Sequence, residues 1–120
     1  MIEIHEYNGE GYLPLVDFEG WRVAILRHNY EFASLTRIER HLETDEVFVL
    51  LSGNATLITK KSAESDATEE LEMEQGKVYN VPKGVWHHIV VTPDANVLIV
   101  ENSNTCDENS EIIQFDSVGG

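Results

Sequence analysis

Turn-forming residues recur at short intervals along the sequence, and between them lie short runs rich in β-branched and aromatic residues. Asn8-Gly9 and Ser52-Gly53 are two of these turns. Runs of this length and spacing predict an antiparallel β-sandwich or β-barrel. We expect strands over residues 21–27, 35–41, 46–51, 55–59, 77–81, 86–91, 95–101 and 112–115. Helical periodicity is missing, apart from one turn that the acidic segment 64–74 could form.

No linker or internal repeat divides the 120 residues, so we expect a single domain spanning residues 1–120. Hydrophobic residues make up 42% of the chain, which is enough for the core of a globular protein. No apolar run approaches the roughly 20 residues that span a bilayer, and residues 1–6 do not resemble a signal peptide. The single cysteine, Cys106, cannot form an internal disulfide, as is usual in reducing compartments. These features predict a cytoplasmic protein.

Acidic residues outnumber basic residues by 22 to 8, and the formal net charge is −14 at pH 7. A surface of this charge repels the phosphates of nucleic acids and the headgroups of anionic membranes. We therefore expect neither nucleic acid nor a membrane as a partner. A small-molecule ligand is the partner class that remains.

Two carboxylates and an imidazole lie at the entrance to the most apolar strand, in the segment RIERHLETDEVFVLLSG. Side chains alternate between the two faces of a strand, so Arg37, Glu39 and His41 point to the same side. Glu46 follows at the start of the next strand. These residues are either solvated charges in front of a core strand or a set that is gathered to hold a cation.

The most apolar strand is hydrophobic on both faces. Val47, Val49 and Leu51 lie on one face and alternate with Phe48 and Leu50 on the other. One protein interior covers only one of these faces, so the other face needs a second sheet or a partner subunit. Together with Trp86, the outer residues would form an apolar patch larger than monomers usually expose. We therefore expect a homodimer, the commonest closed assembly.

Two adjacent histidines follow a Pro-x-Gly turn in the segment GKVYNVPKGVWHHIV. Neighbouring residues of a strand point to opposite faces, so only one of His87 and His88 can face the interior. Val85, His87 and Ile89 form one row of side chains, and Trp86 and His88 belong to the other row.

The spacing of these residues resembles that of the two sequence motifs of small single-domain cupins. The first motif is matched by Glu39-x-His41-x4-Glu46-x6-Gly53. The second motif is matched by Gly76-x5-Pro82-x-Gly84-x2-His87. The resemblance covers residues 33–91 and implies an all-β fold, an antiparallel jelly-roll β-barrel of the cupin type.

The sequence departs from the cupin motifs at three positions. Ala33 replaces the first glycine and Val91 replaces the last asparagine, and both positions are often relaxed in the family. Glu39 replaces the first histidine, which is a metal ligand in the family. This third departure changes the chemistry expected of the site.

The resemblance implies that Glu39, His41, Glu46 and His87 are the ligands of a metal ion. His87 then faces the interior, and we expect His88 and Trp86 to pack on the outer face or at an interface. Two imidazoles and two carboxylates favour a divalent cation such as Fe, Mn or Zn over soft Cu⁺. Arg37 allows two alternatives. It could pair with one of the carboxylates and leave a metal-free, salt-bridged pocket, or it could bind an anionic substrate beside a filled metal site.

The resemblance implies one of two functions. The first is a metal-dependent enzyme acting on a small anionic or hydroxylated substrate, with Glu39 and Arg37 as the candidate catalytic residues. The family includes dioxygenases, isomerases, decarboxylases and lyases, and the fold does not choose among them. The second is a non-catalytic cupin that binds a sugar or a small acid.

Overall fold

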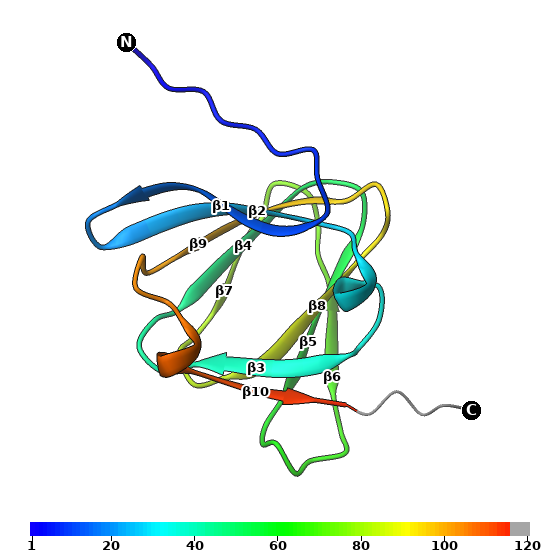
Figure 1. Ribbon diagram of the computed structural model, residues 1–120. Helices are drawn as coiled ribbons and strands as arrows, with labels where there is room; N and C mark the ends of the chain where they lie inside the picture. Colours follow the sequence, from blue (N-terminus) through cyan, green and yellow to red (C-terminus); the bar gives the residue numbers. More distant parts are fainter. Residues whose placement is uncertain (116–120) are drawn as a thin grey trace.

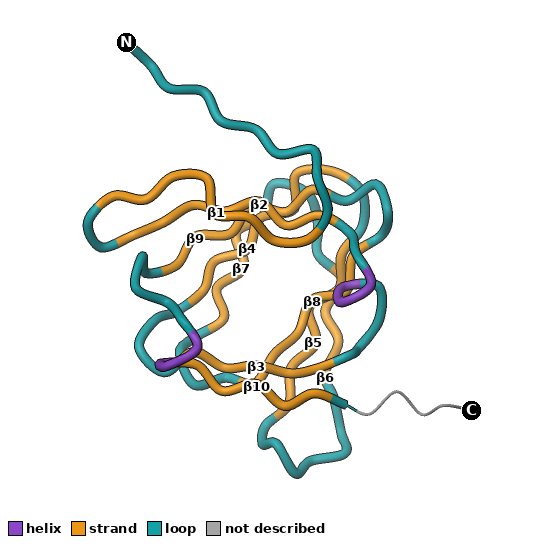
Figure 2. Tube along the Cα trace, in the orientation of Figure 1, coloured by secondary structure: helices purple, strands orange, loops and turns teal. Residues whose placement is uncertain are grey.

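The computed structural model describes residues 1–115, and two five-stranded antiparallel sheets that face each other make up its body (Figure 1). The first sheet has the strand order β1 (Gly11–Phe18), β2 (Trp21–Arg27), β9 (Asn96–Glu101), β4 (Glu46–Ser52), β7 (Val78–Val81). The second sheet has the order β10 (Ser110–Gln114), β3 (Arg37–His41), β8 (Trp86–Val91), β5 (Ala55–Lys60), β6 (Glu69–Glu72). Two short 3₁₀ turns, η1 (Tyr30–Phe32) and η2 (Asp107–Asn109), lie on opposite sides of the molecule in Figure 2.

The predicted all-β jelly roll is confirmed, with one correction. Strand pairing stays within each sheet among residues 1–115, so the two sheets face each other without closing into a continuous barrel. The core lies between the sheets, where Leu26, Leu50 and Val97 are at most 2% exposed. Full burial of such a side chain contributes about 1.5–3 kcal/mol relative to exposure.

Every strand that the sequence predicts is present, and two further strands are found at sheet edges. Strand β1 contains Pro14, and its pairing with β2 shifts register between Pro14 and Val16. An edge strand tolerates a proline because one side of its backbone needs no partner. Strand β6, Glu69–Glu72, is fully exposed and lies in the acidic segment where one helical turn is predicted. That prediction is wrong, because the segment forms a loop and a charged edge strand, which discourages pairing with other chains.

The turn between β4 and β5 requires a glycine at position 53. Gly53 has a φ of +73°, and a Cβ atom there would lie 2.5 Å from the Cα of Ala95. Both the left-handed backbone and the close approach exclude other residues without a shift of the chain. This glycine is the last residue of the first motif.

The apolar outer residues of β4 and the side chain of Trp86 lie on different sheets. Val47 and Val49 point outward from the first sheet, whereas Trp86 belongs to β8 of the second sheet and is only 6% exposed. The guanidinium of Arg40 covers the Trp86 ring at 4.7 Å from its centroid. The prediction of one patch that joins Trp86 to the β4 residues is therefore wrong, and the homodimer stays a prediction.

No helix within residues 1–115 is long and apolar enough to cross a membrane. The segment before β1 extends away from the two sheets (Figure 1).

Candidate metal centre

Glu39, His41, Glu46 and His87 converge at one end of the space between the sheets. One potential ligand atom from each residue lies within 4.8 Å of the others. Strand β3 supplies Glu39 and His41, β8 supplies His87, and β4 of the facing sheet supplies Glu46. Glu39 is paired directly with His87 across β3 and β8, which brings the two motifs together.

The Pro-x-Gly turn of the second motif ties β8 to the end of β3. Gly84 has a φ of +83°, and its backbone N–H donates to the carbonyl of His41 at 2.7 Å. This hydrogen bond fixes the turn beside His41, and the strand that leaves the turn carries His87 inward. His88 follows with its Nε2 bonded to the carbonyl of Ser34 at 3.0 Å, and its ring stacks on Phe32.

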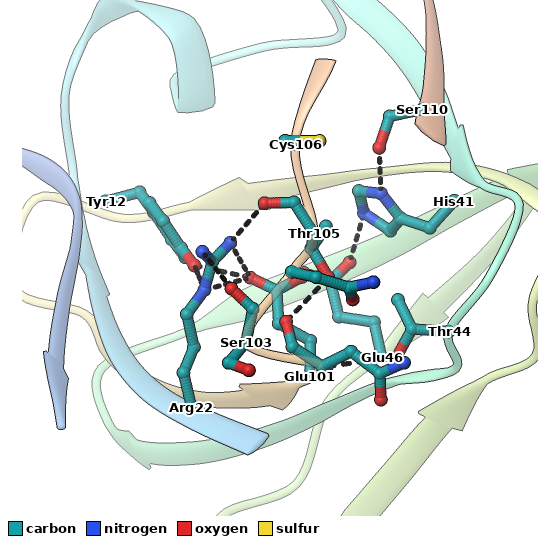
Figure 3. Close-up of polar contacts among 12 residues, drawn as sticks. Tyr12, Arg22, His41, Thr44, Glu46, Glu101, Ser103, Thr105, Cys106 and Ser110 are labelled. Atoms are coloured by element: carbon teal, nitrogen blue, oxygen red, sulfur yellow. Dashed lines mark hydrogen bonds and ion pairs between the residues drawn. The ribbon is translucent and has the colours of Figure 1, made fainter. Parts of the chain in front are cut away.

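Glu46 is the buried centre of the site and is 5% exposed. Its Oε1 atom lies 3.2 Å from Nε2 of His41 and 2.9 Å from Nε2 of His87 (Figure 3 shows His41 and Glu46). The two histidines are themselves 7% and 2% exposed. A single carboxylate oxygen therefore faces two imidazole nitrogens in a site with little access to water.

The other ring nitrogen of each histidine has a partner that fixes the ring. Nδ1 of His87 lies 2.9 Å from the carbonyl of Val85, and Nδ1 of His41 lies 2.8 Å from Oγ of Ser110. A carbonyl only accepts, so Nδ1 of His87 carries a proton. Its Nε2 can then face an ionised carboxylate oxygen only if it carries a second proton or if both atoms bind the same cation.

The pKa values show how the metal-free site balances its charges. Burial lowers the pKa of His41 and of His87, but the hydrogen bond to Glu46 and its negative charge outweigh burial and raise both pKa values. Burial raises the pKa of Glu46, but the hydrogen bonds from the two histidines outweigh it and lower that pKa. The site therefore attracts positive charge, and a divalent cation is an alternative to the two protons.

The donor set fits a divalent metal ion. Glu39 is half-buried, and its side chain makes no hydrogen bond or ion pair with another described residue. Its carboxylate is thus free to complete a set of two imidazole nitrogens and two carboxylates. Such a set suits Fe, Mn or Zn, and its two negative charges offset those of the cation.

Arg37 lies beside this cluster but pairs with neither of its carboxylates. Its only ion pair within the described chain is with Glu31, at 3.5 Å between Nη2 and Oε2. Its Nε atom is buried and has no hydrogen-bond partner. The salt-bridged alternative, in which Arg37 neutralises Glu39 or Glu46, is therefore not the arrangement found. A buried donor without a partner is costly.

A cavity of about 420 Å³ connects these groups. Both sheets line it, and Arg37, Glu39 and Glu46 reach its wall. This volume is in the range of pockets that hold small organic molecules. The four-residue cluster and Arg37 therefore line the same cavity.

Three further cavity residues, Tyr12, Arg22 and Glu101, form a buried network that the sequence analysis misses (Figure 3). Arg22 donates from Nη2 to Oε1 of Glu101 at 2.9 Å and from Nε to the Tyr12 hydroxyl at 3.1 Å, and that hydroxyl donates to Glu101. Burial and the charge of Glu46 raise the pKa of Glu101. Glu101 shares a face with the apolar Ile99, and that alternation is the signal that could have found it.

Sequence comparison finds two curated relatives, and no protein-family model matches the chain. Ureidoglycolate lyase of Pseudomonas savastanoi pv. phaseolicola is 33% identical over 81 residues, which cover 60% of this chain and 48% of that protein. Ureidoglycolate lyase of Pseudomonas syringae pv. syringae is 36% identical over 81 residues with the same coverage. The chain therefore spans about half the length of the curated relatives it matches.

Structural comparison identifies the fold. A cupin-2 domain protein from Shewanella frigidimarina superimposes with a TM-score of 0.61 at 17% identity, over 80% of this chain and 84% of that one. Streptomyces Pac13, described as a nucleoside dehydratase, gives a TM-score of 0.66 at 10% identity over 91% and 83%. KdgF from Halomonas sp. gives 0.56 at 11% identity over 76% and 77%. The two facing sheets are those of a jelly roll, and the chain has the fold of a small cupin.

Proposed function

We propose that the protein is a metal-dependent enzyme acting on a small anionic or hydroxylated substrate, with Glu39, His41, Glu46 and His87 as ligands of Fe, Mn or Zn. The observation that supports this most is the position of Oε1 of Glu46. It faces Nε2 of both histidines, while the Nδ1 atoms are held by other partners. This is how metal-binding histidines are usually oriented by their surroundings.

The residues around the cavity have different roles in the proposed reaction. When bound, a divalent cation acts as a Lewis acid and polarises a substrate oxygen. Arg37 lines the cavity, so its guanidinium is placed to bind a substrate carboxylate. Glu39 either remains a ligand or accepts a proton from the bound substrate, because no other described residue engages its carboxylate.

The names of the relatives support a reaction of the lyase class. Ureidoglycolate lyase and nucleoside dehydratase both denote enzymes that break a bond by elimination. Ureidoglycolate is a small hydroxylated carboxylate, which agrees with the presence of Arg37 on the cavity wall. Ureidoglycolate is therefore the first substrate to test. The assay incubates it with the metal-loaded protein and measures the decrease in its concentration. Turnover would separate an enzyme from a cupin that only binds a sugar or a small acid.

The role of Arg37 is tested with glycolate and its neutral isostere glycolamide. Calorimetry of the Mn²⁺-loaded protein should show tighter binding of glycolate, and Arg37→Gln should remove that preference. Loss of one charged hydrogen-bonded contact of this kind costs about 1.5–3 kcal/mol, or roughly 10- to 150-fold in affinity. Arg40→Gln is the matched control, because Arg40 lies on the same strand and covers Trp86 instead. Unchanged glycolate binding by Arg37→Gln would exclude this role.

The cytoplasmic location and the homodimer also belong to this proposal. A reducing compartment agrees with the single exposed thiol of Cys106.

A further inference from the structure

Glu101 is a buried carboxylate on the cavity wall that has no role in the proposed reaction above. It is the last residue of β9 and is 5% exposed. It lines the same cavity as the four-residue cluster. Glutamates are rarely buried to this extent unless they are paired, and the pairing of Glu101 leaves part of its carboxylate unused.

The two oxygens of this carboxylate have different surroundings. Oε1 accepts hydrogen bonds from the Tyr12 hydroxyl and from Nε and Nη2 of Arg22, with the two nitrogens at 3.3 and 2.9 Å (Figure 3 shows the three residues). Oε2 makes no hydrogen bond with any residue in the described part of the chain. An ionised carboxylate offers about two acceptor sites on each oxygen, so those of Oε2 are all available.

Oε2 is open to the cavity rather than enclosed by protein. Among residues 1–115, the one fully buried side-chain nitrogen or oxygen without a hydrogen-bond partner is Nε of Arg37. Oε2 of Glu101 has no partner either, so solvent must reach it. The cavity is the open space that Glu101 lines, and Oε2 is therefore accessible to a molecule bound there.

Arg22 and Tyr12 hold the carboxylate of Glu101 in one orientation. Nη2 of Arg22 also donates to the carbonyl of Thr105 at 3.2 Å, which anchors the guanidinium to the segment after β9. A side chain that is already ordered loses little conformational entropy when a ligand binds to it. Oε2 is thus a preorganised acceptor.

Glu101 also lies next to Glu46 of the four-residue cluster. Strand pairing places Val100 of β9 opposite Val47 of β4, so Glu101 and Glu46 form the next pair in this register. Residues opposite each other on neighbouring strands have Cβ atoms about 4.5–5.5 Å apart. Both glutamates line the cavity, so a small molecule bound at the cluster lies within reach of Oε2.

We propose that Oε2 of Glu101 accepts a hydrogen bond from a hydroxyl group of the substrate, so that Glu101 selects hydroxy acids. This inference rests on the proposed function and assigns the two polar groups of the substrate to different walls of the cavity. Arg37 on β3 binds the carboxylate, and Glu101 on β9 of the facing sheet binds the hydroxyl group. A site that hydrogen-bonds a substrate hydroxyl discriminates strongly against an analogue without it, because the buried acceptor is left unpaired.

The test compares glycolate with methoxyacetate, in which a methyl ether replaces the hydroxyl group. Both acids have a carboxylate and a second oxygen that can bind a metal, but only glycolate can donate a hydrogen bond from that oxygen. Calorimetry of the Mn²⁺-loaded protein should show that glycolate binds roughly 10- to 150-fold more tightly, the range expected for one hydrogen bond to a charged group.

Glu101→Gln should remove this preference by weakening the binding of glycolate. Tyr12 and Arg22 both donate, so they retain the amide oxygen and turn the amide nitrogen, which is a donor, toward the cavity. Glutamine has the size of glutamate, so a preference that comes only from the bulk of the methyl ether would persist in this variant. Glu101→Asp keeps the charge but withdraws the carboxylate by one methylene group, and it should also reduce the preference.

Glu111→Gln is the matched control. Glu111 also pairs with an arginine, Arg40, but it lies outside the residues that line the cavity. This variant should bind both acids like the unmodified protein. Thermal melting of all variants identifies any that is unfolded, and Glu101→Asp carries the test if Glu101→Gln does not fold.

The outcomes separate this inference from the proposed function. Equal affinity of the unmodified protein for the two acids would overturn the role of Glu101, as would a preference that persists in the folded Glu101 variants. Metal content is measured on the same samples, and a protein without Mn²⁺ is compared in its metal-free form. The absence of glycolate binding in both forms would also overturn the role. Turnover of ureidoglycolate is a separate result, and its absence would refute the enzyme while leaving a Glu101-dependent preference intact.

Discussion

Replacement of Glu39 by glutamine removes a charge from the four-residue cluster while keeping the shape of the side chain. The Glu39 carboxylate has no hydrogen bond or ion pair within the described residues, so the metal-free protein should keep its stability. Its affinity for a divalent metal should fall. The ligand atoms lie within 4.8 Å of one another, so a cation held among them lies closer than that to the Glu39 carboxylate. A unit negative charge at such a separation attracts the cation by at least about 3 kcal/mol at an effective dielectric constant of 20. This corresponds to roughly a 100-fold loss of affinity.

Two assays on one sample measure this effect. Metal titration gives the affinity directly, and thermal melting at a fixed metal concentration gives its consequence for stability. A 100-fold weaker site loses about 2.7 kcal/mol of metal-dependent stabilisation, which is about 10 °C for a chain of this size. Glu46→Gln is the informative comparison. It removes the negative charge that two buried histidines face, so it should also cost the metal-free protein about 3–5 kcal/mol.

Two results would refute this reasoning. Unchanged metal affinity in Glu39→Gln would remove Glu39 from the ligand set and leave His41, Glu46 and His87. A large loss of melting temperature in the metal-free Glu39→Gln protein would mean that Glu39 has a structural partner, contrary to the geometry of the site.

Two further predictions concern the histidines. Without metal, stability should be greatest between about pH 4.5 and 6.5, the ordinary pKa values of Glu and His. The raised pKa values of His41 and His87 stabilise the fold below pH 6.5, and this stabilisation is lost as the pH rises through the pKa values of the two histidines in the folded protein. The lowered pKa of Glu46 stabilises the fold above pH 4.5, and this stabilisation is lost as the pH falls through the pKa of Glu46 in the folded protein. Urea unfolding across pH tests this, and a maximum above pH 8 would contradict it. Ser110→Ala should weaken metal binding by roughly 10- to 100-fold without unfolding, because Nδ1 of His41 loses its partner, and an unchanged titration would show that Ser110 does not orient the ring.

The site was predictable because its residues follow a local rule. Alternation along a strand puts Glu39 and His41 on one face, and the resemblance to the second cupin motif assigns His87 rather than His88 to the interior. Both rules need only the sequence close to each residue. The spacing to Glu46 then links the two motifs.

The network of Tyr12, Arg22 and Glu101 was not predictable in the same way. Pro14 obscures β1 as a strand, so the inward position of Tyr12 cannot be derived from alternation. The three residues meet only because β1, β2 and β9 are neighbours in the sheet, although β9 is far away in sequence. Strand order depends on the packing of the whole fold and has no local signal.

The same limit applies to two other residues. The partner of Arg37 is Glu31, which lies in the 3₁₀ turn η1 outside any predicted strand. Trp86 was assigned to the patch of Val47 and Val49 because each points outward, but outward from different sheets. Alternation gives the face of a strand and not the sheet to which the strand belongs.

The central claim is that Glu39, His41, Glu46 and His87 hold a divalent metal ion. The most direct test is to measure the metal content of the protein, purified without a polyhistidine tag, by elemental mass spectrometry. The measurement is made before and after loading with Fe²⁺, Mn²⁺ or Zn²⁺. We predict about one equivalent of one of these metals per chain, and its loss in His87→Ala, because His87 supplies an Nε2 aimed at the site. A loaded protein without stoichiometric metal, or a His87→Ala variant that retains a full equivalent, would contradict the claim.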